Sequence, residues 1–270
     1  MVYGLLYLPL ELHRSLLAEI HHFDDSKVLT PTVRSSLMQT LCTPGTDLFR
    51  NCGWATRVMS ARDISAAMLK PAGAYNLNAQ AMDATIDLIK DVFAKGVTVK
   101  EIYIDTIGSP EVYQKKLERV FPTTKITVAK KADSLFPCVS AASVCAKVTR
   151  DAALKVCYQS YQSSIGYNPD HYAEGWGSGY PSDARTVTWL QEHMDSCFGW
   201  GNECRFSWGT AKDMLEAKQH AARTDWPLPD DEEQGMRVTD FYQPSSSGER
   251  ENEADELATW YGRPAIEAVF

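Results

Sequence analysis

Residues 101–110 read EIYIDTIGSP, a short hydrophobic strand that ends in a carboxylate. The isoleucines of this stretch alternate with their neighbours, as in a β-strand with a buried face. Asp105 follows, and the chain then turns through a Gly-Ser-Pro sequence. A second strand pattern, KITVAKKAD (125–133), leads into Asp133. The sequence therefore places two carboxylates just beyond two short apolar strands.

Helical patterns lie between and around these strands. Residues 75–96 carry an apolar stripe at helical spacing, and Gly96 ends the pattern. A further strand is predicted in residues 1–10, and residues 51–64 read as a strand and a turn. The other predicted helices begin at Thr30-Pro31, Ser109, Pro137, Ser182 and Ser207. This alternation predicts an α/β fold with helices packed on a sheet.

Length and composition set broad limits. The chain has 270 residues, of which 44% are apolar, enough for one large domain or for two. No run of about 18 apolar residues occurs, so no membrane span is expected, and the apolar start reads as a core strand rather than a signal peptide. The seven cysteines form no CxxC pair, which argues against zinc and favours a reducing compartment.

Charge is distributed unevenly along the chain. The net charge is −8, which by itself gives no reason to propose nucleic acid as a partner. Acidic residues are concentrated between Pro229 and Glu256, and the rest of the chain is much nearer neutrality. We therefore predict a folded part over residues 1–222. We expect residues 223–270 to form an acidic, largely flexible tail that could end in a short helix.

The two carboxylates suggest a metal site. If their strands are neighbours, Asp105 and Asp133 converge, and they repel each other unless one is protonated or a cation lies between them. A hard cation such as Mg²⁺ prefers such oxygen ligands and supports phosphodiester chemistry. The alternative is structural, because aspartate commonly follows a strand where the chain turns. Spacing alone leaves both interpretations open.

Four motifs narrow the choice: IDTIG, AKKAD, VSAASVCAKVTRD and GWGSGYPSD, in this order. Together with DDSKVLT, YNLN and RFSW they resemble type 2 ribonuclease H, in particular the catalytic subunits of the eukaryotic heterotrimers. The resemblance covers roughly residues 1–222. It implies a ribonuclease-H-like mixed sheet flanked by helices, with a helical C-terminal extension. It also implies two accessory subunits and a nuclear location, with the cytoplasm as a second one.

The implied activity is endonucleolytic. Members of this family cleave RNA in RNA–DNA hybrids and incise at single ribonucleotides in duplex DNA, using Mg²⁺ or, as a substitute, Mn²⁺. By resemblance, Asp105 and Asp133 are catalytic metal ligands. Two ions would bridge the scissile phosphate, one activating water and the other stabilising the leaving 3′ oxygen. Tyr180 matches the tyrosine that senses the ribose 2′-hydroxyl, a group that distinguishes RNA from DNA; the alternative is a partly buried aromatic beside a turn.

Several other residues are candidates for contact with nucleic acid. Lys147 and Arg150 lie near one face of a predicted helix that passes close to the site in the family. The remaining candidates are Ser26 and Lys27 of the DSK loop, Asn76 of YNLN, and Gly179, where the backbone can approach a ligand. For Lys27 the alternative is a solvated surface charge, and for Asn76 it is a structural role.

One family signature does not occur in the 270 residues. This is an N-terminal strand followed by Asp-Glu-Ala-Gly-Arg-Gly, which supplies two further carboxylates and recognises the ribonucleotide junction. Without it we expect a gap where the first central strand would lie, and little or no nuclease activity. A truncated gene model, an alternative start, and a non-catalytic binding subunit or pseudo-enzyme are the explanations considered. An unrelated small-molecule enzyme is disfavoured, because no dinucleotide or phosphate-loop fingerprint occurs.

The tail contains one further motif. MRVTDFYQP (236–244) has an aliphatic residue three positions before a Phe-Tyr pair, so residues 235–242 look like a peptide that binds a sliding clamp. Gly235 stands where such peptides usually have glutamine. The alternative is a segment that docks on the accessory subunits.

Overall fold

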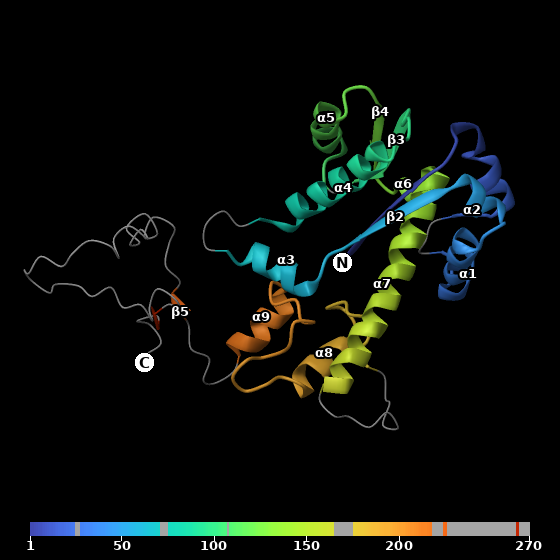
Figure 1. Ribbon diagram of the computed structural model, residues 1–270. Helices are drawn as coiled ribbons and strands as arrows, with labels where there is room; N and C mark the ends of the chain where they lie inside the picture. The colour runs from blue at the N-terminus through green and yellow to red at the C-terminus, as the bar shows by residue number, and fades with distance from the viewer. Residues whose placement is uncertain are drawn as a thin grey trace, which may run out of the picture. The chain divides into compact units, whose positions relative to one another are not determined.

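Figure 1 shows the computed structural model, which describes residues 1–24, 28–70, 75–106, 108–164, 175–217, 224–225 and 263–264. The chain divides into two units. The first comprises Met1–Ala61 and Leu77–Trp176, and the second comprises Arg62–Asn76 and Gly177–Phe270. Strands alternate with helices through the first unit, which confirms the predicted α/β class.

Two pairs of strands make up the sheet of the first unit. Strand β1 (Val2–Tyr7) pairs antiparallel with β2 (Gly53–Val58). Strand β3 (Glu101–Asp105) pairs in parallel with β4 (Lys125–Ala129). Among the described strands no ladder joins β1 to β3. The sheet is therefore divided in the middle, which agrees with the gap expected from the sequence.

Helices cover both strand pairs. The two longest are α4 (Leu77–Ala94) and α7 (Pro137–Ser164). Helix α7 lies against β1 so closely that a Cβ on Gly4 would collide with the Ala142 carbonyl oxygen, which requires glycine at this position. The other helices of this unit are η1 (Leu10–Leu12), η2 (Ser15–Ile20), α1 (Pro31–Cys42), α2 (Asp47–Asn51), α5 (Pro110–Val120) and α6 (Ala132–Leu135).

Two apolar clusters lie in the first unit, one for each strand pair. Leu6 of β1 packs with Leu41 and Val144, from α1 and α7. Ile102 of β3 packs with Ile89 of α4 and Leu117 of α5. Burying such side chains is the main favourable contribution to folding, about 1.5–3 kcal/mol for each fully buried leucine or isoleucine.

The second unit contains α3 (Ala61–Met68), α8 (Ala184–Glu192) and α9 (Gly209–Glu216). Its core contains Leu190, Trp200, Cys204 and Ala211. Strands β5 (Thr224–Asp225) and β6 (Arg263–Pro264) form a short antiparallel pair. The β6 residues fall inside the predicted terminal helix and form a strand there, whereas the rest of that segment lies outside the described residues.

Local signals located several element ends correctly. The Thr30 hydroxyl accepts a hydrogen bond from the Val33 N–H at 3.3 Å, as expected of a helix cap. Gly96 adopts a left-handed φ of 78° just beyond α4. Two starts were displaced, because Asp183 rather than Ser182 caps α8, and α9 begins at Gly209.

One helix was missed altogether. Residues 51–64 were predicted to form a strand and a turn, but α3 begins at Ala61. In the part of the chain that the structure describes, no helix is both long enough and apolar enough to cross a membrane.

Candidate active site

The two predicted metal ligands lie at the same edge of the strand pair β3–β4. Asp105 is the last residue of β3. Beyond β4, Lys131 adopts a left-handed φ of 55° and directs the chain into α6, which begins Ala132-Asp133. The Ala132 N–H donates to Asp105 Oδ1 at 3.2 Å. This bond holds the Asp105 carboxylate beside the residue that immediately precedes Asp133.

Both aspartates line one cavity of about 760 Å³ in the first unit. Asp105 is exposed, whereas Asp133 is only 7% exposed. Within the described part of the chain, the hydrogen bonds to the Asp105 carboxylate come from the Thr106 N–H, at 3.0 Å, and the Ala132 N–H, and both reach Oδ1. Oδ2 therefore keeps its lone pairs for a ligand.

This donor set fits a hard divalent cation in kind. Carboxylate oxygens are the ligands that Mg²⁺ prefers, and it needs about six of them, commonly including waters and substrate phosphate. Among the described residues no group of three or more His, Cys, Asp or Glu side chains could hold a metal ion. The two carboxylates thus provide part of a metal site that substrate and further ligands would complete.

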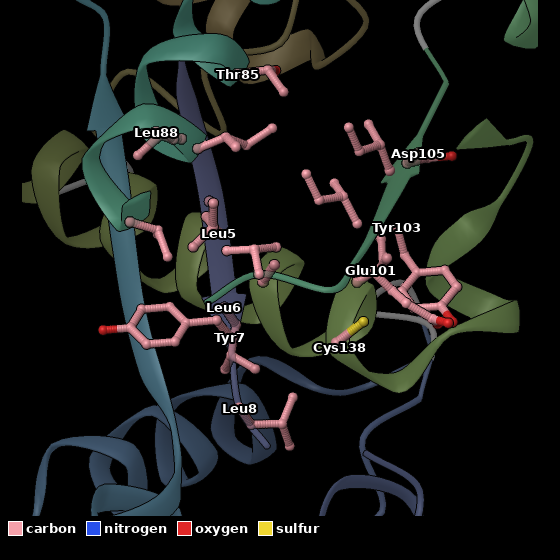
Figure 2. A pocket seen from close by; sticks show the side chains of 18 of the residues that line it. Leu5, Leu6, Tyr7, Leu8, Thr85, Leu88, Glu101, Tyr103, Asp105 and Cys138 are labelled. Carbon is pink, nitrogen blue, oxygen red and sulfur yellow. The ribbon is translucent and has the colours of Figure 1, made fainter. Parts of the chain in front are cut away.

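The cavity interior is uncharged apart from its ends. Burial raises the pKa of the Cys138 thiol to about 11 and lowers the pKa of His13. A hydrogen bond from Tyr103 to Glu101 raises the pKa of the phenol to about 12 and lowers the pKa of the carboxyl. Figure 2 shows Cys138 low in the cavity and Asp105 at its far end. The acidic end and the neutral interior are therefore distinct regions.

Lys147 and Arg150 are three residues apart on α7, on neighbouring positions of one helix face. Arg150 forms an ion pair with Asp151 at 3.1 Å, and its side chain is 22% exposed. The same helix lines the cavity with Ala142 and Ala146. Contact of either cation with phosphate stays a prediction.

The glycine-rich loop of the second unit is held by the start of α8. Asp183 Oδ2 accepts a hydrogen bond from the Ser178 N–H at 2.7 Å, and Thr186 Oγ1 accepts one from the Gly179 N–H at 3.1 Å. The bond from Ser178 is the main reason why the pKa of Asp183 falls to about 2. At Gly177 a Cβ would come within 2.8 Å of Asp183 Oδ2. Glycine is therefore required at this position by the chain itself.

Tyr180 follows in this loop with 54% of its surface exposed, more than the partly buried aromatic of the alternative interpretation. Asn76 is also exposed and belongs to the second unit. The structure thus brings Asp105 and Asp133 together, whereas Tyr180, Gly179 and Asn76 belong to the other unit. Ser26, Lys27 and residues 235–242 lie outside the described residues.

Sequence reasoning missed Asp183 and Thr186, which shape the loop that carries Tyr180. One signal was available, because aspartate is as good a helix cap as the serine chosen one residue earlier. No local signal marks the bond from Ala132 to Asp105, which joins residues on two different strand ends.

Comparison with known proteins gives consistent results. The family model for ribonuclease HII matches residues 1–211. The ribonuclease H2 subunit of this type from Neurospora crassa is 57% identical over 267 residues, covering 98% of this chain and 80% of that protein. Its human counterpart is 37% identical over 242 residues, covering 90% of this chain and 76% of that protein.

Solved structures show the same fold. Ribonuclease H2 from Pyrococcus horikoshii superposes with a TM-score of 0.58 at 21% identity, covering 80% of this chain and 98% of that one. A ribonuclease HII from Archaeoglobus fulgidus, solved as a complex with PCNA, gives a TM-score of 0.57 at 21% identity, covering 77% of this chain and 86% of that one.

Proposed function

Because the chain belongs to the ribonuclease HII family, we propose that the enzyme to which it contributes cleaves RNA in RNA–DNA hybrids and incises duplex DNA at single ribonucleotides. The products would carry 3′-hydroxyl and 5′-phosphate ends. One observation carries the proposal most directly: Asp105 and Asp133 line one cavity, and both lie within the residues that match the family.

Asp105 and Asp133 would hold divalent cations, Mg²⁺ or Mn²⁺, against the scissile phosphate. Bound cations of this kind supply an activated water and stabilise the leaving oxygen. The two backbone N–H bonds to Asp105 Oδ1 orient its carboxylate in advance, so that Oδ2 need not reorganise when substrate arrives. Such preorganisation is the usual source of a large catalytic effect in sites of this type.

Recognition of the nucleic acid is assigned to other residues. Tyr180, which is exposed, would pack on the ribose and sense its 2′-hydroxyl. The residues proposed to contact the backbone are Ser26, Lys27, Asn76, Lys147, Arg150 and Gly179. Such contacts set affinity and register rather than sequence preference.

The 270 residues alone should cleave slowly or not at all. They contain no Asp-Glu-Ala-Gly-Arg-Gly segment, which by resemblance supplies the other two carboxylates. Removing half of the acidic ligands weakens cation binding and in-line positioning. The second candidate, a non-catalytic binding subunit, predicts binding of hybrids without cleavage under all conditions.

The test uses a labelled duplex with one ribonucleotide and an all-DNA duplex as control. We expect Mg²⁺-dependent binding of the first by the purified chain, reduced by Asp105→Asn and by Asp133→Asn, with little cleavage on a denaturing gel. Equal binding of both duplexes, insensitive to either substitution, would overturn the proposed substrate class. Rapid Mg²⁺-dependent cleavage abolished by Asp105→Asn would support the nuclease and refute the low activity of the isolated chain.

We further propose two accessory subunits, a nuclear location and clamp binding through residues 235–242. The relatives are named as subunits, and a similar archaeal enzyme was solved with PCNA. Co-purification tests the subunits, and imaging of a fluorescent fusion tests the location. A peptide of residues 232–246 should bind the clamp and lose binding with Phe241→Ala; binding to the accessory subunits instead would favour the alternative.

A further inference from the structure

The cavity that contains Asp105 and Asp133 separates two strand edges. Its lining includes residues of β1 on one side and of β3 on the other. Figure 2 shows Leu5 to Leu8 facing Glu101 to Asp105 across this space, with the two strands running in opposite directions. All lining residues belong to the first unit.

The hydrogen-bond pattern shows which backbone groups of β1 face the cavity. Met1 and Met59 exchange both N–H···O bonds, at 2.6 and 2.8 Å. Residues of an antiparallel ladder alternate, so Tyr3, Leu5 and Tyr7 also direct their backbone groups to β2. The residues between them direct theirs to the opposite edge: Val2, Gly4 and Leu6.

The same argument applies to β3. The Lys125 N–H donates to the Lys100 carbonyl and the Thr106 N–H donates to the Ala129 carbonyl, each at 3.1 Å. In a parallel ladder the bonds from one strand come from alternate residues, so Ile102 and Ile104 also face β4. The residues between them direct their N–H and C=O groups to the cavity: Glu101, Tyr103 and Asp105.

The two remaining sides of the cavity are apolar. Helix α4 contributes Leu88, Ile89 and Val92 to one side, and α7 contributes Val139 and Ala142 to the other. A strand between β1 and β3 would therefore be covered on both faces, which requires apolar side chains on both. A small apolar ligand would leave the two rows of backbone donors and acceptors without partners, which is costly in a dry site.

We propose that this cavity is an acceptor site for one added β-strand, an extended polypeptide segment that pairs with β1 and β3 at the same time. The segment is about five residues, or about 17 Å, long and apolar on both faces. It runs antiparallel to β1 and parallel to β3, which continues the pairing that each strand already has. Main-chain bonds supply affinity, as in other strand-addition complexes.

The direction of this strand has a functional consequence, which rests on the proposed function. The C-terminal end of a strand parallel to β3 lies beside Asp105, the last residue of β3. An acidic residue just beyond that end would join Asp105 and Asp133 as a further oxygen ligand. The acceptor site would then complete the metal site with a carboxylate from another segment.

The first test is amide hydrogen exchange of the full chain, followed by NMR. The probe is a capped peptide with a core of alternating valine and isoleucine and lysines at both ends for solubility. We expect at least tenfold slower exchange at the six cavity-facing amides, and smaller changes at Tyr3, Leu5, Ile102 and Ile104. No such pattern at about 1 mM peptide, a concentration that detects even weak binding, overturns the proposal.

Two controls isolate strand pairing from simple apolar binding. A peptide of the same sequence with alternate amides N-methylated keeps the side chains but lacks ladder donors, and it should not protect the edges. In the protein, Cys138→Phe places a ring in the cavity, whereas Cys157→Phe changes an exposed position of the same helix, α7. Only the first should abolish protection, and equal effects of both would count against the cavity as the binding site.

The second test separates this inference from the proposed function. The same peptide, extended by two acidic residues at its C-terminal end, is added to the chain with Mg²⁺ and the ribonucleotide-containing duplex. We expect at least a tenfold rise in cleavage over the unextended peptide. Protection without cleavage would support the strand site and refute its catalytic link, whereas dimerisation of the chain in place of peptide binding would refute the proposed occupant.

Discussion

Asp105 and Asp183 have similar local surroundings and different consequences. Each accepts two backbone N–H hydrogen bonds. Those to Asp105 both reach Oδ1, whereas Asp183 uses Oδ2 for Ser178 and Oδ1 for Arg185. Asp183 therefore spends both oxygens on its own loop, while Asp105 keeps one oxygen directed to a cavity that a second aspartate shares. The use of each oxygen, rather than the count of bonds, separates a structural aspartate from a candidate ligand.

The largest expected effect concerns catalysis. In the enzyme assembled with its other subunits, Asp105→Asn should lower the Mg²⁺-dependent cleavage rate at least 100-fold, because an amide is a poor ligand for a hard cation. Asp183→Asn should change this rate less than threefold. Cleavage assays on purified assemblies with matched circular dichroism spectra measure both. Equal losses would mean that the oxygen count does not distinguish the two residues.

Two glycines next to these aspartates offer the next test. Both have left-handed φ, 67° at Gly177 and 91° at Gly108. A Cβ on Gly177 would collide with Thr186 and Asp183, but one on Gly108 has open space within 4 Å. We expect Gly177→Ala to lower the free energy of unfolding by about 2–4 kcal/mol and Gly108→Ala by about 1–2 kcal/mol. Urea titrations that give the reverse order would contradict the tight loop around Asp183.

A third prediction concerns pH. Folding lowers the pKa of Asp183 to about 2, chiefly through the hydrogen bond from Ser178. A depressed carboxyl pKa stabilises the folded state above the ordinary pKa near 4, and this contribution disappears as pH falls towards 2. The wild type should therefore exceed Asp183→Asn in denaturation midpoint at pH 5, and the difference should shrink steadily down to pH 2. A difference that is constant with pH would exclude the carboxylate charge as its source.

The smallest effect is expected at Asp151, a third aspartate that pairs with Arg150 near the surface. Exposed ion pairs contribute about 0–1 kcal/mol, so Asp151→Asn should change the free energy of unfolding by less than about 0.5 kcal/mol. Binding of the ribonucleotide-containing duplex should rise slightly, because Arg150 is released for phosphate. Weaker binding in an anisotropy titration would argue against Arg150 as a phosphate ligand.

Comparison of prediction and structure shows which signals were sufficient. Thr30, Gly96 and the strand that ends at Asp105 were all located from neighbours within a few residues. The start of α3 at Ala61 was missed, because a polar Arg-Asp pair within a short segment gave no clear helical period. The ordered motifs identified the family over most of the chain, and the family match confirms that resemblance.

The candidate site was predicted in part. The sequence placed Asp105 and Asp133 beyond two strands but left open whether those strands are neighbours, and the parallel pairing of β3 with β4 decides it. Neither the bond from Ala132 to Asp105 nor the oxygen usage of Asp183 could be read from spacing, because both depend on how separate elements are oriented.

By itself, the sequence determined the chemistry at hand: which residues are acidic, where helices are capped, and which apolar stripes must be buried. These properties depend on contacts within one or two turns of the chain. Only the tertiary structure decided that the edges of β1 and β3 face one apolar cavity and that Gly4 must admit α7. Such facts depend on packing between residues up to about a hundred positions apart, where no local preference operates.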